Sequence, residues 1–162
     1  MYEKLLDRAA ELGLTVIEKY PFASARIRGL CCDDTIAISA QVDTDAERKV
    51  VLCEEIAHAM HSYGDITQDK RMEQRVRQRS FDYLIGLPGI LRAFLDGCRQ
   101  PWEFAEHFDV PEDFFLAAME NYKQRYGVMT KVTLDDNEYT LSFEPTLRVR
   151  RYLKRPRRKA AV

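Results

Sequence analysis

The spacing of apolar residues changes twice along the chain, and the order of these changes limits the folds open to it. Apolar side chains recur at helical spacing over residues 2–12, and two short strands are expected at 25–31 and 35–39. Helical stretches follow, and alternating residues return only within 128–147. A helix, a small sheet, several helices and a late hairpin, in that order, predict an α+β fold.

Several helices are expected between the two regions of alternation. The longest spans 43–64, where Asp43 or Thr44 can cap its start and Gly64 can end it. The others are predicted over 68–85, after Pro88 within 87–98, and as a pair over 101–110 and 111–127. Each helix of the pair begins at a proline, and a glycine follows the second one.

Length and composition are those of a globular protein. The chain has 162 residues, 46% of them apolar and 31% charged, which is enough for a core without disulfide bonds. No apolar run approaches the roughly 18–20 residues of a membrane span, and the N-terminus is amphipathic rather than signal-like. We expect one domain over 1–127, an appended hairpin over 128–147 and a basic tail over 148–162.

The four cysteines predict reduced thiols. Cys31, Cys32, Cys53 and Cys98 are irregularly spaced and form no CxxC motif. Two adjacent cysteines on a strand point to opposite faces, which suits no simple disulfide. Free thiols are typical of a cytoplasmic protein, and that location is expected here.

The net charge of −1 conceals a strong asymmetry. The segment 148–159 holds 8 of the 25 basic residues and no acidic ones, so the remainder has 17 basic and 26 acidic residues. We interpret this basic tail as a solvated end that contacts the acidic body. The rival interpretation is contact with the phosphates of a nucleic acid.

The stretch LCEEIAHAMHSYGD, within the longest predicted helix, carries a possible metal site. Glu54 and His58 are four residues apart and therefore lie one turn apart on one face, as two metal ligands must. Glu55, directly after the first of them, stands where a general base can take a proton from water. The string alone is common on surface helices, but its apolar neighbours predict partial burial, and buried carboxylates need a partner or a metal.

Together with its flanks, this stretch resembles the ImmA/IrrE family of metallo-endopeptidases, especially the forms encoded by phages and integrative elements. The similar segments, in order, are GLCCDDTIAIS, ERKVVLCEEIAHAMHSYGDI, MEQRVRQRSFDYLIGL and WEFAEHFDVPEDFFLAAMENYKQRYG. The resemblance covers most of the chain. It implies a zincin-like minimal metallopeptidase fold, with a small antiparallel sheet and a mainly helical body.

The resemblance also implies roles for individual residues. His58 would be a zinc ligand, Glu55 the general base, and Glu54 would stand where the common HExxH pattern has its first histidine. Glu73 is the candidate for the third protein ligand, with Asp69 as the alternative. His61 is a further alternative, because it shares the helical face of Glu54 and His58.

The donor set affects the choice of metal. Two carboxylates and one imidazole nearly neutralise a divalent ion, which makes it a weaker Lewis acid. We therefore expect either weak hydrolysis with zinc or a harder ion such as manganese, and a protein without metal is the remaining possibility.

The resemblance implies that the substrate is a helix-turn-helix repressor of a phage or mobile element, whose cleavage relieves repression. Peptide substrates of such sites commonly add as a strand to a sheet edge, which predicts a role for the 25–31/35–39 hairpin. The alternative is a non-catalytic anti-repressor that acts by binding. Residues 101–127 have the spacing of a helix-turn-helix themselves, but their Phe, Leu and Ala residues favour packing over DNA contact.

Overall fold

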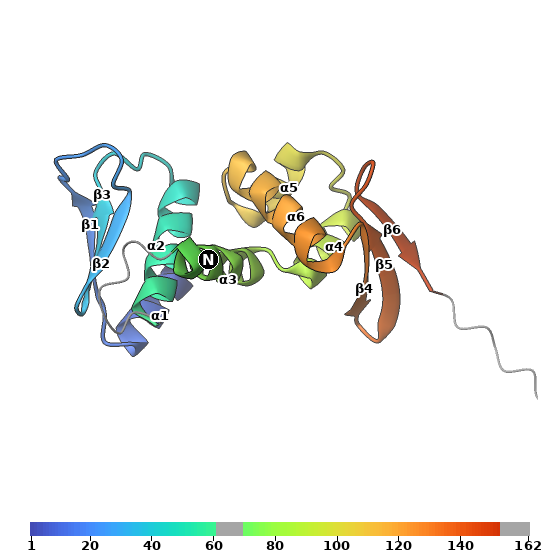
Figure 1. Cartoon of the computed structure of the whole chain (residues 1–162), viewed down its shortest axis with the longest axis horizontal. Helices are drawn as coiled ribbons and strands as arrows, with labels where there is room; N and C mark the ends of the chain where they lie inside the picture. Colours follow the sequence, from blue (N-terminus) through green and yellow to red (C-terminus); the bar gives the residue numbers. More distant parts are fainter. Residues whose placement is uncertain (61–69, 153–162) are drawn as a thin grey trace, which may run out of the picture.

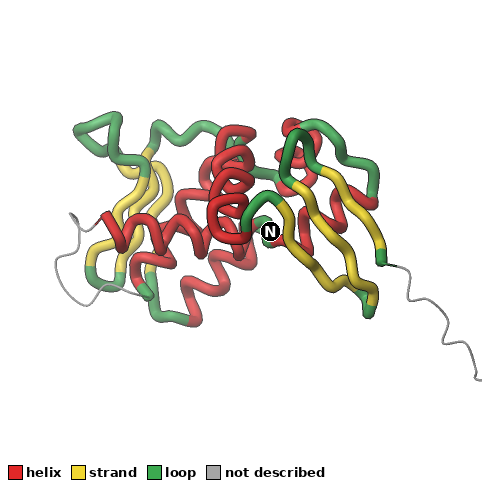
Figure 2. Tube along the Cα trace, turned by 45° about the vertical axis from the view of Figure 1, so that its right-hand side comes forward, coloured by secondary structure: helices red, strands yellow, loops and turns green. Residues whose placement is uncertain are grey.

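The computed structural model describes residues 1–60 and 70–152, which form six helices and two three-stranded sheets. The α+β class predicted from the sequence is confirmed. Figures 1 and 2 show the helices in the middle of an elongated molecule, with one sheet at each end. None of the described helices is both long enough and apolar enough to cross a membrane.

The N-terminal sheet follows helix α1 (Tyr2–Glu11) and has the strand order β1-β3-β2. Its strands are β1 (Thr15–Tyr20), β2 (Gly29–Cys32) and β3 (Thr35–Ser39). β3 pairs in parallel with β1 and antiparallel with β2, so β2 is an edge strand. The sequence did not predict β1, and β2 begins at Gly29 rather than at residue 25, which corrects the predicted strand 25–31.

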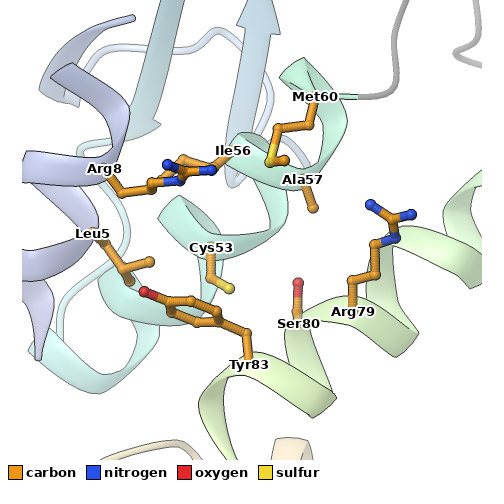
Figure 3. Close-up of a pocket in the computed structure, with 9 residues that line it drawn as sticks. All are labelled: Leu5, Arg8, Cys53, Ile56, Ala57, Met60, Arg79, Ser80 and Tyr83. Carbon is orange, nitrogen blue, oxygen red and sulfur yellow. The ribbon is translucent and has the colours of Figure 1, made fainter. Parts of the chain in front are cut away.

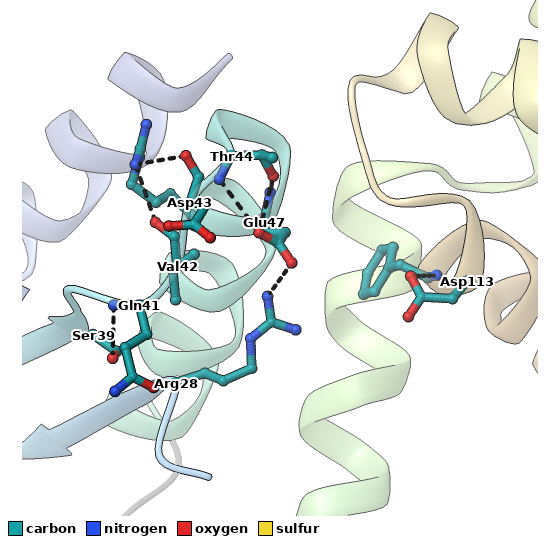
Figure 4. A network of polar contacts seen from close by, with 10 residues as sticks. Arg28, Ser39, Gln41, Val42, Asp43, Thr44, Glu47 and Asp113 are labelled. Carbon is teal, nitrogen blue, oxygen red and sulfur yellow. Dashed lines mark hydrogen bonds and ion pairs between the residues drawn. The ribbon is translucent and has the colours of Figure 1, made fainter. Parts of the chain in front are cut away.

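Helix α2 (Asp45–Ala59) packs beside this sheet, and its start is well defined. Thr44, one of the two predicted caps, accepts a hydrogen bond from the Glu47 backbone, and Glu47 in turn accepts one from the Thr44 backbone. Arg28, just before β2, donates to Glu47 at 2.9 Å and ties the sheet to the helix (Figure 4). The predicted stop at Gly64 lies outside the described residues.

The remaining helices match the predicted segments closely. They are α3 (Lys70–Leu84), α4 (Leu87–Leu95), α5 (Pro101–Phe108) and α6 (Glu112–Tyr126). In the last pair the aromatic rings pack inward: Phe104 stacks on Phe115 with centroids 5.1 Å apart, and both are buried. The 101–127 segment therefore packs as expected, while Trp102 lies exposed in the first turn of α5.

A buried lysine joins the two halves of the helical layer. The Lys49 side chain on α2 is almost fully buried, and its ammonium donates to the Phe108 carbonyl at 2.7 Å and to Asp109 Oδ2 at 2.8 Å. Both acceptors lie at the end of α5. A buried ammonium needs such partners, so this contact holds α2 against the C-terminal helix pair.

The C-terminal sheet contains β4 (Met129–Leu134), β5 (Asn137–Ser142) and β6 (Arg148–Arg151), all antiparallel. Asp135 and Asp136 join the first two strands with positive φ at both residues, as a two-residue hairpin turn requires. The predicted hairpin is confirmed. The first four residues of the predicted basic tail form β6, so the sheet has a third strand beyond the predicted hairpin, although its arginines are exposed.

Candidate metal and carboxylate site

The predicted site residues come from two helices and lie beside one sheet edge. Glu54, Glu55 and His58 lie on α2, Glu73 lies in the first turn of α3, and the adjacent edge strand is β2. The capping box at Thr44 and the buried Lys49 fix where α2 begins and how it lies in the fold. These contacts determine which turn of the helix faces α3 and β2.

His58 and Glu73 are brought together, as predicted. Nε2 of His58 lies 3.5 Å from Oε1 of Glu73, although the residues belong to different helices. The histidine side chain is 23% exposed and the carboxylate 57% exposed, so this contact lies at the rim of the site. An imidazole and a carboxylate at this separation are two ligands of the kind that divalent metals use.

Glu54 is half-buried next to opposing charges. Burial raises the pKa of Glu54 above its usual range; Arg77 and Arg28 act in the opposite direction, and Glu73 adds to the rise. Sequence reasoning did not assign either arginine to the site. The spacing of Glu73 and Arg77 on α3 could have suggested that they share a face.

Glu55, the predicted general base, is half-buried between α2 and the sheet. Burial, together with the carboxylates of Glu54 and Glu73, raises the pKa of Glu55 to about 7, and a backbone hydrogen bond from Cys31 opposes the rise. A carboxyl group with a pKa near neutrality suits proton transfer at neutral pH.

Gly29 is a site residue that the sequence analysis missed. A Cβ atom at this position would lie 2.6 Å from Val51 Cγ1 and 2.7 Å from Glu55 Oε1, so any larger residue would force one of these side chains to move. The edge strand β2 therefore approaches the general-base position without an intervening side chain. A glycine inside a predicted strand is the signal that could have indicated this close approach.

The chemistry of the donor set fits a cation. Three carboxylates and a histidine come from α2 and the start of α3; besides burial, the charge of Glu73 raises the pKa of Glu54 and Glu55, and the charge of Glu54 raises that of Glu55. Within residues 1–60 and 70–152, no group of three or more His, Cys, Asp or Glu side chains is close enough to hold a metal ion. The alternative ligands Asp69 and His61 lie outside the described residues.

The opposite face of α2 lines an apolar cavity of about 230 Å³ between α1, α2 and α3 (Figure 3). Cys53, Ile56 and Ala57 contribute from α2, Met60 from the cap that follows it, and Ser80 points into the cavity from α3. Burial raises the pKa of the Cys53 thiol to about 11, so it is a poor nucleophile. All four cysteines, which the sequence predicts to be reduced, are free thiols in the structure.

Comparisons with protein-family models, with curated proteins and with solved structures found no match to this chain.

Proposed function

We propose that the protein is a metallo-endopeptidase with a zincin-like fold. The observation that carries the proposal is the 3.5 Å contact between His58 and Glu73, which joins two helices beside the half-buried Glu55. Glu54, His58 and Glu73 would hold a divalent metal, zinc or alternatively manganese. The resemblance of the flanking segments to the ImmA/IrrE metallo-endopeptidases supports the same assignment.

The protein's own residues divide the work of peptide hydrolysis. Glu55 accepts a proton from the attacking water and can return it to the leaving amine. A bound divalent metal supplies Lewis acidity that polarises the scissile carbonyl. Arg77 and Arg28 reduce the electrostatic repulsion among the half-buried carboxylates, because their positive charges oppose the rise in the pKa of Glu54.

The edge strand β2 is suited to hold an extended peptide. Its partner in the sheet is β3 on one side, and it has no strand neighbour on the other among the described residues. A substrate segment that added there as a strand would pass Gly29, where the backbone lies next to Glu55. This arrangement would bring a peptide bond to the general base without a side chain in between.

From the resemblance, the substrate would be a helix-turn-helix repressor of a phage or mobile element. Its cleavage in the cytoplasm would relieve repression. The test is co-expression with the repressor encoded beside this chain, scored for a shortened repressor fragment. We expect a fragment with the wild type and with Glu3→Gln, a control on exposed α1, and none with Glu55→Gln. A fragment of unchanged abundance with Glu55→Gln would refute the proposal.

A non-catalytic anti-repressor is the second candidate, and the observation that favours it is Glu54. A carboxylate in place of the first histidine weakens the Lewis acidity of any bound metal. In this alternative, the protein would bind the repressor without cutting it. Metal analysis of the purified protein separates the two: no stoichiometric metal, together with normal relief of repression by His58→Ala, favours binding alone.

A further inference from the structure

The C-terminal sheet has one face turned to the core and one turned outward. Val132, Tyr139 and Leu141 are buried, and the sheet packs on α4 and α6 through β4. Because side chains alternate along a strand, the residues between them face outward. The register of the three strands therefore defines which residues meet on the outer face.

Two rows of that outer face carry the positive charge. In the first row, Lys131 on β4 pairs with Thr140 on β5, which pairs with Arg150 on β6. In the second row, two residues further along β5, Ser142 pairs with Arg148. Residues two apart on a strand are separated by about 7 Å, and β4 and β6 by about 10 Å. The three cations thus span a patch of roughly 7 by 10 Å, which we call the outer basic face (Lys131, Arg148 and Arg150).

The outer basic face is exposed and its charges are not neutralised within the described chain. All three cations are exposed, and none forms an ion pair with a carboxylate of residues 1–60 or 70–152. By contrast, Lys123 and Arg92, near the same sheet, pair with Glu144 and Asp135. The Lys131 ammonium instead lies 5.7 Å from the ring centroid of Tyr152.

The distribution of charge along the sequence favours a polyanionic partner. Residues 153–159 add five basic residues directly after this sheet and no acidic ones, whereas the chain outside 148–159 has 17 basic and 26 acidic residues. The acidic remainder repels a polyanion, so a polyanion would be steered to this end of the molecule. Helix α2 and strand β2, which carry the candidate site, lie in the other half of the molecule (Figure 1).

We propose that the outer basic face binds the phosphate backbone of nucleic acid without reading its bases. Cations about 7–10 Å apart can contact separate phosphates, and the neighbouring Thr140 hydroxyl adds a hydrogen-bond donor. Base readout is not part of the proposal, because the one aromatic ring of this face already contacts Lys131. The binding would be independent of the metal site.

The test measures fluorescence anisotropy of the full-length protein with a labelled 20-base-pair DNA duplex and with a labelled single strand, over a series of salt concentrations. The variant Lys131→Gln/Arg148→Gln/Arg150→Gln removes the outer basic face. The matched control Lys4→Gln/Arg26→Gln/Arg75→Gln removes the same charge from exposed positions elsewhere. A third variant, Arg148→Lys/Arg150→Lys, keeps the charge and checks that the strand tolerates substitution.

For the wild type we expect binding to at least one probe, with affinity that falls steeply as salt rises. The outer-face variant should lose at least about tenfold in affinity for the duplex, with a log–log salt slope shallower by about 2–3. The control and the lysine variant should stay close to the wild type. Equal losses in the outer-face variant and the control, unchanged binding by the outer-face variant, or no binding of either probe would overturn the proposal. Binding of poly-glutamate but of neither nucleic acid would overturn it in favour of an acidic protein partner.

Discussion

Glu55 is the residue on which the chemistry of the candidate site depends, and its surroundings oppose ionisation. It is half-buried, it neighbours the carboxylates of Glu54 and Glu73, and its pKa is raised to about 7. When the pKa of a carboxyl group is higher in the folded protein than in the unfolded chain, its ionisation destabilises the fold. A bound cation would reverse that effect.

Replacing Glu55 with glutamine should therefore stabilise the metal-free protein in a pH-dependent way. Below about pH 4.5 the carboxyl is protonated in both states, so the variant and the wild type should unfold with similar free energy. As the pH rises from about 4.5 to about 7, the wild type loses stability because Glu55 ionises in the unfolded chain but not in the folded protein; above about pH 7 the variant should be more stable by about 2 kcal/mol. Urea unfolding in chelator at pH 4.5 and 8 measures this, and a difference independent of pH would contradict it.

A side chain at position 29 should destabilise the protein because it would collide with Val51 and Glu55, an effect that can be separated from strand propensity. Gly29→Ala places a methyl group against Val51 and Glu55, and we expect it to cost about 1–3 kcal/mol in unfolding free energy. The cost should shrink in a Glu55→Ala background, because one of the two obstructing side chains is then removed. Identical costs in both backgrounds would show that the contact with Glu55 is unimportant.

At the scale of single residues, helical spacing predicted that Glu54 and His58 lie on one face of α2, because that depends only on local geometry. The contact of His58 with Glu73 joins two helices, and Glu73 was expected near the site from the resemblance rather than from spacing. Gly29, Arg28 and Arg77 were not assigned to the site. Their roles depend on how β2 and α3 pack on α2, and a single helix pattern carries no such information.

Among the elements, α2 occupies the central position, since it contributes to the candidate site, the apolar cavity and the contact with the C-terminal helices. Its Lys49 ammonium is held by Phe108 and Asp109, at the end of α5. The sequence pattern gave no indication of a buried lysine, because helix periodicity places lysine on the solvent face.

Breaking this contact should uncouple α2 from the helix pair. Asp109→Ala leaves the buried ammonium with one carbonyl partner and places alanine at a left-handed position, so we expect a loss of about 2–4 kcal/mol in unfolding free energy. Asp113→Ala, on the exposed start of α6, is the control and should cost much less. Equal losses, measured by thermal unfolding, would argue against a structural role for the Lys49–Asp109 pair.

The elements that were not predicted share a physical cause. β1 buries none of its side chains, so no alternation of apolar residues marks it in the sequence. It forms a strand because its backbone pairs with β3. β6 consists of three arginines and a valine, a composition that does not predict a strand. Its backbone becomes a strand by pairing with β5. Helices were predicted well because their apolar faces and caps are encoded locally.

At the scale of the whole molecule, the two proposed sites differ in charge and lie apart. Carboxylates gather beside the N-terminal sheet, and cations gather on the outer face of the C-terminal sheet, at the other end (Figure 1). Such a separation would let a nucleic-acid contact and a metal-dependent reaction proceed without competing for one surface.

Independence of the two ends is a direct prediction. Glu55→Gln should leave the salt slope of nucleic-acid binding unchanged, and the variant that removes the outer basic face should retain the metal affinity of the wild type within about twofold. Isothermal titration with zinc and the anisotropy assay report the two properties separately. A large change of either property by the distant variant would indicate coupling between the ends.

The central claim is that Glu55, with a metal held by Glu54, His58 and Glu73, hydrolyses a peptide bond. The most direct measurement incubates purified protein with the purified repressor encoded beside it and determines fragment masses by mass spectrometry. We predict two fragments that sum to the repressor plus one water, formed by the wild type and abolished by chelator or by Glu55→Gln. An intact repressor in a stable complex with the metal-loaded wild type, or fragments that persist with Glu55→Gln, would contradict the claim.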